Sequence, residues 1–233
     1  GVTYRQLGFP KRAVEYIQRA IESNPNEPSF YTNLARALMD LGTDADSLLA
    51  LANKALLLNP KEREARNIKG IALTRKGEYR EAEYLYQGLI VDFPDHVDAY
   101  QNFGMLLMEA GKAEHAVNFF TKAVMLQPDN PNNYIQRARA RLSLNQLEPS
   151  QYELSEALER FPGNSDVEHE AARLLFTMNE SRKGVEYAEK ALKSDPQNYH
   201  KAITLGVSCL MNGQPEKSLE AMKLAQKCAP AGN

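Results

Sequence analysis

The sequence predicts an all-α solenoid, and three recurring features lead to that fold class. Prolines recur at a step of 35 residues once and of 34 residues thereafter, at Pro25, Pro60, Pro94, Pro128, Pro162, Pro196 and Pro230. Columns of small residues and a column of glycines keep register with these prolines. Fixed self-similarity at this length is typical of repeat proteins in which each unit packs only on its neighbours.

The prolines mark the joints between units. Proline removes a backbone donor and clashes with the preceding turn, so a residue recurring at this step lies outside the helices. If the joint proline is numbered 32 in a 34-residue unit, positions 8, 20 and 27 hold small residues in most units. Position 27, for example, holds Ala20, Ala55, Leu89, Ala123, Ala157, Ala191 and Ala225. Such columns indicate two helices that cross too closely for large side chains.

A glycine at position 15 divides most units into two helices. It can adopt the left-handed conformation that ends one helix and turns the chain back, and it is present at Gly8, Gly42, Gly77, Gly111 and Gly213. Segments of about 14 residues with apolar residues at helical spacing lie between the turns, for example Val97–Ala110 and Ala113–Leu126. Polar residues after each joint proline can cap the next helix. The second unit has one extra residue around 43–46, which predicts a longer turn there.

The pattern resembles the tetratricopeptide repeat (TPR) family, whose units are antiparallel helix pairs with small residues at positions 8, 20 and 27 and proline at 32. The clearest match is formed by Phe103, Gly104, Ala116, Phe120, Ala123 and Pro128. The resemblance implies a right-handed α-solenoid (superhelix) of helix-turn-helix units and covers residues 1–233 as a single solenoid. The approximate repeats, the first truncated at its N-terminus, are 1–27, 28–62, 63–96, 97–130, 131–164, 165–198 and 199–233.

The second and fifth units, and position 4, depart from the family pattern. Position 4 is usually aromatic in the family, and it is tyrosine in three units, at Tyr31, Tyr100 and Tyr134. Other units have Arg66, Glu168 and Ala202 there, and Leu48 occupies a position normally held by a small residue. We expect the stacking of the helix pairs to be kept at these places.

Charge and hydropathy exclude several classes of partner. A net charge of −2 gives no reason to expect binding to nucleic acid. The sequence lacks an apolar run of about 18 residues, so we expect no membrane insertion by this segment. The N-terminus does not have the pattern of a signal peptide. We therefore expect a cytoplasmic protein by default, with an anchor before Gly1 left open.

The two ends of the sequence fall inside the repeat pattern. Gly1 falls at position 8 of its unit, and the chain stops just after the joint at Pro230. Terminal repeats usually need a polar outer face. We favour an excised fragment over ends that are covered by a partner or by another copy.

Sequence motifs for catalysis are lacking, and we expect neither an enzyme nor a cofactor. The sequence has no phosphate-binding glycine loop and no Cys-x-x-Cys motif. His169-Glu170 begins like the zinc metalloprotease signature, but Arg173 stands where the second histidine must be. Asp166, His169 and His200 could approach one another across adjacent helices as metal ligands; solvated polar residues near helix starts are the favoured interpretation, so we predict no metal site.

Cys209 and Cys228 are not expected to form a disulfide. One precedes the predicted turn at Gly213 by four residues and the other follows it by 15. At about 1.5 Å of rise per residue the axial offset is roughly 16 Å, beyond the approximately 7 Å that a disulfide can span. Cys209 is best explained as a small core residue.

The candidate site is a surface. In the TPR family the first helices of the units line the concave face, and positions 2, 5, 9, 12 and 13 contact ligands. Methionines on this face suit apolar partners of varied shape, and arginines can hold carboxylates bidentately. The candidate peptide-binding residues are Arg36, Met39, Asn67, Ile71, Arg75, Gln101, Met105, Met108, Ile135, Arg139, Leu142, His169, Arg173, Phe176, Ile203 and Val207. The alternative is that positions 12 and 13 pack on the next unit and that the arginines pair with nearby acids.

A further cluster in the fifth unit consists of Arg137, Arg139 and Arg141. Arg137 and Arg141 occupy positions 7 and 11, which are normally apolar packing positions. An uncompensated buried arginine is costly. We expect Arg137 and Arg141 to reach solvent by their stems or to pair with acids, for which the sequence offers Glu153, Glu156, Glu168 and Glu170. A structural ion-pair cluster is the favoured interpretation, and an anion or acidic-peptide site is the alternative.

These features predict a non-catalytic scaffold that holds a peptide or helix of a partner protein in its concave groove. The lysine and asparagine that chaperone-binding TPR domains carry at positions 5 and 9 never occur together here, which disfavours that subclass. Two alternatives stay open. One is a self-assembling structural module, with homo-oligomers, and the other is a substrate-recruiting domain of a larger enzyme.

Overall fold

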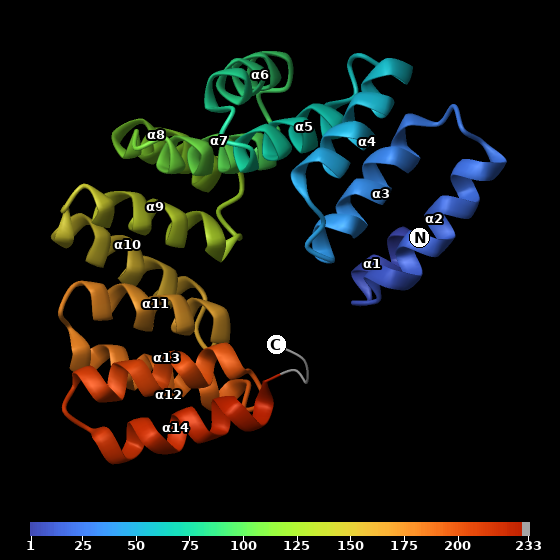
Figure 1. The fold of residues 1–233 in the computed structure, drawn as a ribbon. Helices are drawn as coiled ribbons and strands as arrows, with labels where there is room; N and C mark the ends of the chain where they lie inside the picture. The colour runs from blue at the N-terminus through green and yellow to red at the C-terminus, as the bar shows by residue number, and fades with distance from the viewer. Residues whose placement is uncertain (230–233) are drawn as a thin grey trace. The chain divides into compact units, whose positions relative to one another are not determined.

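The computed structural model describes residues 1–229 and is all-α, as predicted. These residues form fourteen helices and no strand (Figure 1). The helices are connected by short turns, and the first and second helices of the repeats alternate along the chain, as the proline period predicts. The joint at Pro230 and the end of the chain lie outside the described residues.

The chain divides into two compact units, and each is described by itself. Unit 1 is Gly1–Lys112, and unit 2 begins at Ala113. The division falls inside the fourth predicted repeat. Unit 1 contains α1 (Val2–Gln6), α2 (Pro10–Ser23), α3 (Pro28–Asp40), α4 (Ala45–Leu58), α5 (Arg63–Arg75), α6 (Tyr79–Asp92) and α7 (Val97–Glu109). Unit 2 contains α8 (Ala113–Leu126), α9 (Pro131–Ser143), α10 (Leu147–Arg160), α11 (Ser165–Thr177), α12 (Ser181–Ser194), α13 (Tyr199–Met211) and α14 (Pro215–Cys228).

Each helix packs on its neighbours in sequence within a unit. The helix pairs α1–α2, α3–α4 and α5–α6 form in unit 1, and α9–α10, α11–α12 and α13–α14 form in unit 2. First helices of successive repeats also touch, α3 with α5 and α5 with α7, and likewise α9 with α11 and α11 with α13. The first helices therefore form one continuous layer in each unit, and this layer carries the candidate site.

The turns within the helix pairs confirm the role predicted for position 15. All five predicted glycines have φ between +73° and +78°. In the two units that lack glycine, Asn145 and Asn179 occupy the same position with φ of 58° and 64°. Asparagine tolerates this conformation better than most residues. The turn between α3 and α4 has four residues where the other such turns have three, which confirms the predicted longer turn.

The joints between repeats are held by two kinds of hydrogen bond. The position 4 hydroxyls of Tyr31, Tyr100 and Tyr134 donate to the carbonyl oxygens of their own joint prolines at 2.8, 3.1 and 3.1 Å. The side chain two residues after the proline caps the next helix in four repeats, at Glu27, Asn130, Asn164 and Asn198. At Glu62 and His96, the same position has no side-chain cap bond.

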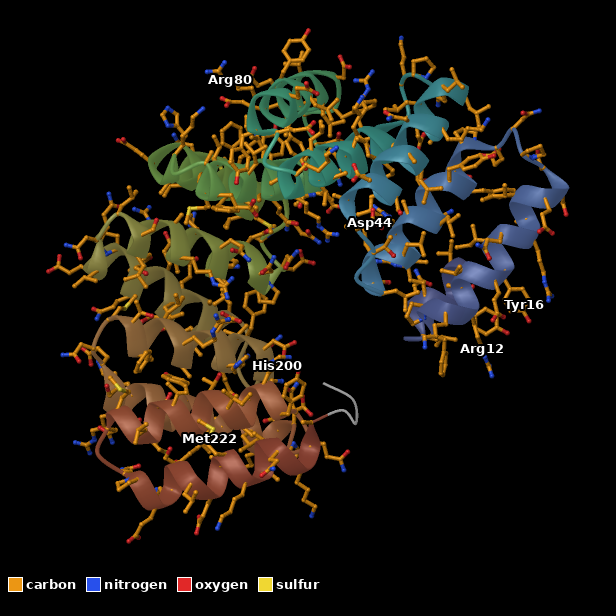
Figure 2. All side chains as sticks on the ribbon, viewed as in Figure 1. Arg12, Tyr16, Asp44, Arg80, His200 and Met222 are labelled. Atoms are coloured by element: carbon orange, nitrogen blue, oxygen red, sulfur yellow. The ribbon has the colours of Figure 1, made fainter. Side chains whose placement is uncertain are left out.

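The small residues at position 8 allow the close helix crossings that the columns predict. A Cβ atom added at Gly70 would lie 2.4 Å from Cζ of Tyr86, and one at Gly206 would lie 2.8 Å from Cε of Met222. The Met222 side chain lies at the interface of α13 and α14 (Figure 2). Leu48, which replaces a small residue, is fully buried in a cluster with Ala35, Ala52, Ile68 and Ala72.

Candidate functional site

In unit 1 the first helices α3, α5 and α7, with Arg5 of α1, line a cavity of about 360 Å³. Five predicted site residues lie in its lining: Arg36, Met39, Asn67, Ile71 and Gln101. Four further residues complete it: Arg5, Asp40, Asp98 and Asn102. The cavity surface is mostly polar, since Met39 and Ile71 are its only aliphatic side chains among these nine.

The charges in the unit 1 cavity are matched within the chain. Arg5 binds Asp40 through both Nε, at 2.6 Å, and Nη2, at 3.3 Å. Arg36 pairs with Glu64, and its Nη2 lies 3.6 Å from Oδ2 of Asp98. Each guanidinium therefore already has at least one carboxylate of its own.

In unit 2 the helices α9, α11 and α13 line a cavity of about 320 Å³ with a largely apolar surface. The predicted residues in its lining are Arg139, Arg173, Phe176, Ile203 and Val207. Residues that join them are Glu170, Leu174, Thr177, Thr204 and Ser208. A neighbouring cavity of about 380 Å³ shares Arg173, Ile203 and Thr204 and adds Asp166, His169, Asn198, His200 and Lys201.

Polar contacts connect the first helices of consecutive repeats in both units. Asn102 Nδ2 donates to Asn67 Oδ1 at 3.0 Å in unit 1, and His169 Nε2 lies 2.8 Å from Thr204 Oγ1 in unit 2. Both contacts join position 5 of one repeat to position 6 of the next. Burial lowers the pKa of His169, against the opposing effect of the nearby Glu170 carboxylate. His169 therefore favours the neutral imidazole.

Five predicted site residues lie outside these cavities. Arg75 is exposed, with Nη1 3.5 Å from the carbonyl oxygen of Thr43. Met105 is exposed and Met108 is half-buried on α7. Ile135 is 3% exposed within the core of unit 2, and Leu142 packs against that core. Ile135 and Leu142 therefore contribute to packing in this structure.

Position 6 of the first helices also contributes to the cavities, although it was not among the predicted ligand positions. Asn102, Glu170 and Thr204 all occupy it, and all three line cavities. Position 6 neighbours positions 2, 9 and 13 on the same helical face, so helical spacing alone could have predicted that its side chains line the cavities. Arg5 occupies position 12 of the first repeat, from which no candidate residue was predicted.

The arginine cluster of α9 is an ion-pair cluster, as favoured from the sequence. Arg137 pairs with Glu153, and Arg141 Nε lies 3.1 Å from the same carboxylate. Arg137 and Glu153 are 12% and 5% exposed. Arg139 turns to the other side and pairs with Glu170 at the cavity.

Three further sequence hypotheses concern a metal site, a disulfide between the two cysteines and a membrane-spanning helix. Among residues 1–229, no group of three His, Cys, Asp or Glu side chains could hold a metal ion. His200 lies at the start of α13 (Figure 2), and its ring centroid is 3.9 Å from that of Tyr199, with the two rings tilted by 34°. Cys209 is buried, and Cys209 and Cys228 are both free. No helix in the described part of the chain is long and apolar enough to cross a membrane.

Comparison with protein families identifies the repeats. Two family models described as "Tetratricopeptide repeat" match, one over residues 1–62, 45–97 and 169–233 and the other over residues 73–142. Together these matches cover most of the chain. The chain belongs to the tetratricopeptide repeat family.

This chain matches parts of longer curated relatives and has the fold of several solved TPR structures. The human "Protein O-mannosyl-transferase TMTC3" is 32% identical over 127 residues, which are 53% of this chain and 14% of that protein. The fold is similar to that of yeast Tom70, with a TM-score of 0.76 and 18% identity, over 95% of this chain and 48% of that one. It is also similar to YrrB, described as "a TPR protein with an unusual peptide-binding site", with a TM-score of 0.53, 22% identity, and coverage of 81% and 97%. The chain spans well under half the length of the curated relatives it matches.

Proposed function

We propose that this chain is a non-catalytic interaction scaffold that binds a peptide or helix of a partner protein on its first helices. The observation that carries this proposal is the position of two cavities, the one of about 360 Å³ in unit 1 and the one of about 320 Å³ in unit 2. In each unit the cavity lies on the layer of first helices, and five of the predicted ligand positions line it. The description of YrrB as a peptide-binding TPR protein is consistent with such a role.

The proposed surface offers binding groups rather than reactive ones. Amide, guanidinium, carboxylate and aliphatic side chains line the unit 1 cavity, and aliphatic, aromatic, hydroxyl, carboxylate and guanidinium side chains line the unit 2 cavity. Such groups recognise an extended or helical segment through hydrogen bonds and apolar contacts. Another copy of the chain is an alternative occupant, and light scattering over a concentration series distinguishes it: a monomer at every concentration excludes self-association.

Selection of peptides from a displayed library on the full chain tests the proposal. Ile71→Arg in unit 1 and Val207→Arg in unit 2 place a charge in the two cavities. The controls are Leu57→Arg on α4 and Tyr152→Arg on α10, because these side chains are 77% and 69% exposed outside the cavities. We expect a cavity variant to weaken binding of selected peptides at least tenfold and the controls to leave it unchanged. Peptides that bind both cavity variants as they bind the unsubstituted chain would overturn the proposal.

A further inference from the structure

The cavities of the two units differ in charge balance. In unit 1, the charged residues that line the cavity are Arg5, Arg36, Asp40 and Asp98, so two guanidinium groups face two carboxylates. In unit 2, the charged residues that line the apolar cavity are Arg139, Glu170 and Arg173. Two guanidinium groups there share one carboxylate. The unit 2 cavity therefore has an excess positive charge.

Arg173 is the less firmly held of the two arginines. Its Nη1 lies 3.0 Å from Oε1 of Glu170, three residues earlier on the same helix, and its side chain is 55% exposed. Glu170 also pairs with Arg139, whose side chain is 33% exposed. Exposed ion pairs of this kind contribute little to stability. Arg173 can therefore turn toward a second carboxylate at small cost.

Apolar side chains lie directly beside Arg173. Ile203 and Val207 on α13 are 39% and 37% exposed, and Phe176 on α11 is half-buried in the same cavity. Leu210 and Met211 follow on α13 at 58% and 60% exposure. Residues 203, 207, 210 and 211 have the spacing of one helical face. An exposed apolar strip along α13 thus leads away from the cavity.

We propose that the unit 2 cavity binds a partner segment in which an aliphatic side chain lies next to a carboxylate. The aliphatic group enters between α11 and α13, against Phe176, Ile203 and Val207. The carboxylate completes the charge balance on Arg173, which can hold it through two parallel N–H donors. This proposal rests on the proposed function and specifies the chemistry of the partner.

Defined peptides test the proposed chemistry directly. Four fluorescein-labelled peptides of about twelve residues share a glycine–serine frame and differ at two adjacent central positions: leucine–aspartate, leucine–lysine, leucine–asparagine and serine–aspartate. Fluorescence anisotropy with the full chain gives each Kd. We expect the leucine–aspartate peptide to bind at least tenfold more tightly than the other three.

Charge reversal supplies a readout that a merely structural role would not give. Arg173→Glu is expected to weaken the leucine–aspartate peptide at least tenfold and to make leucine–lysine the preferred peptide. Val207→Asp is expected to weaken every peptide that contains leucine. Arg182→Glu, an exposed change on α12 of the same unit and outside the cavities, is the matched control and should leave all four Kd values unchanged. Circular dichroism checks that each variant is folded.

The contrary results distinguish failure of this inference from failure of the proposed function. Equal binding of the leucine–aspartate and leucine–lysine peptides, no response to Arg173→Glu, or no binding of any of the four peptides overturns the proposal for unit 2. Suppose that one of these results is found, but library-selected peptides bind the chain and Ile71→Arg weakens their binding. The proposed function then stands, while the inference about unit 2 fails. If selected peptides respond only to Leu57→Arg or Tyr152→Arg, both fail.

Discussion

The guanidinium of Arg66 donates two hydrogen bonds to the carbonyl oxygen of Pro60, from Nε at 3.2 Å and from Nη2 at 3.1 Å. In three other repeats a tyrosine hydroxyl at the same position makes this contact with its own joint proline. Arg66 also pairs with Asp92 at the end of α6. The departure from an aromatic residue at position 4 therefore preserves the hydrogen bond that joins one repeat to the next.

Removal of this contact is expected to destabilise unit 1. Arg66→Ala should lower the free energy of unfolding by about 1–2 kcal/mol, because it removes hydrogen bonds from a charged donor. Arg66→Tyr should recover most of the loss, since tyrosine makes the equivalent bond elsewhere in the chain. Urea denaturation followed by circular dichroism measures both. Arg80→Ala on the exposed side of α6 is the control, and an equal effect of Arg66→Ala and Arg80→Ala would contradict the prediction.

The same substitution at two glycines should have opposite effects. Gly70→Ala places a Cβ atom 2.4 Å from the buried Tyr86 ring, so we expect a loss of about 1–3 kcal/mol from overpacking. Gly88→Ala on α6 meets nothing within 4 Å and is exposed, and alanine is the better helix former by about 1 kcal/mol. We therefore expect Gly88→Ala to raise the midpoint of thermal unfolding and Gly70→Ala to lower it. A rise with both would show that α5 and α6 can separate without cost.

The proline period predicted the fold because the same local chemistry recurs in every repeat. Helix pairs, turns and joints are local features, and the pattern placed α8 at Ala113–Leu126, where the structure has it. Asn145 and Asn179 show that the conformation at position 15 is kept even where the glycine is not. That the seven repeats form one continuous solenoid stays a prediction, and the structure has two compact units.

The candidate site was harder to predict because it depends on contacts between repeats. Position 5 meets position 6 of the following repeat, so Asn67 is 3% exposed and hydrogen-bonded to Asn102. Ile135 at the same position is buried in the core of unit 2. A list of helix positions does not include the rotation of each helix against the next, and this rotation decides which side chains face the cavity. The pairing of Arg137 with Glu153 was predictable because a buried guanidinium requires a carboxylate.

Glu153 is expected to be the most sensitive member of its cluster. Glu153→Gln leaves Arg137, 12% exposed, and Arg141, 27% exposed, without their shared carboxylate. Removing one partner of a buried ion pair costs about 3 kcal/mol or more, and Arg137 keeps only the more distant carboxylate of Glu156, at 3.8 Å. Combining Glu153→Leu with Arg137→Leu should recover much of the stability, because apolar groups can replace a buried pair. The measurement is the urea midpoint, with the exposed Glu148→Gln on α10 as control; equal midpoints for Glu153→Gln and Glu148→Gln would contradict the prediction.

His96 predicts how the stability of unit 1 depends on pH. The side chain is 5% exposed, and burial lowers its pKa against the opposing influence of Glu64, whose Oε1 lies 3.9 Å from Nε2. The other charged groups that act on it are Arg63, Asp95 and Asp98. Since the folded-state pKa is lowered, the unfolded chain binds the proton more readily. The contribution of His96 to stability is therefore complete above a pH of about 6.5 and is lost as the pH falls below that value.

His96→Asn removes this titration and places at the joint the residue type that caps α9, α11 and α13 at the same position. We expect the unfolding midpoint of this variant to fall less between pH 7.5 and pH 5 than that of the unsubstituted chain, with some fall remaining because burial also lowers the pKa of His169. His115→Asn, at an exposed position on α8, is the control and should keep the full pH dependence. The prediction fails if His96→Asn and the unsubstituted chain lose stability in parallel, since the buried imidazole would then play no part in the acid sensitivity.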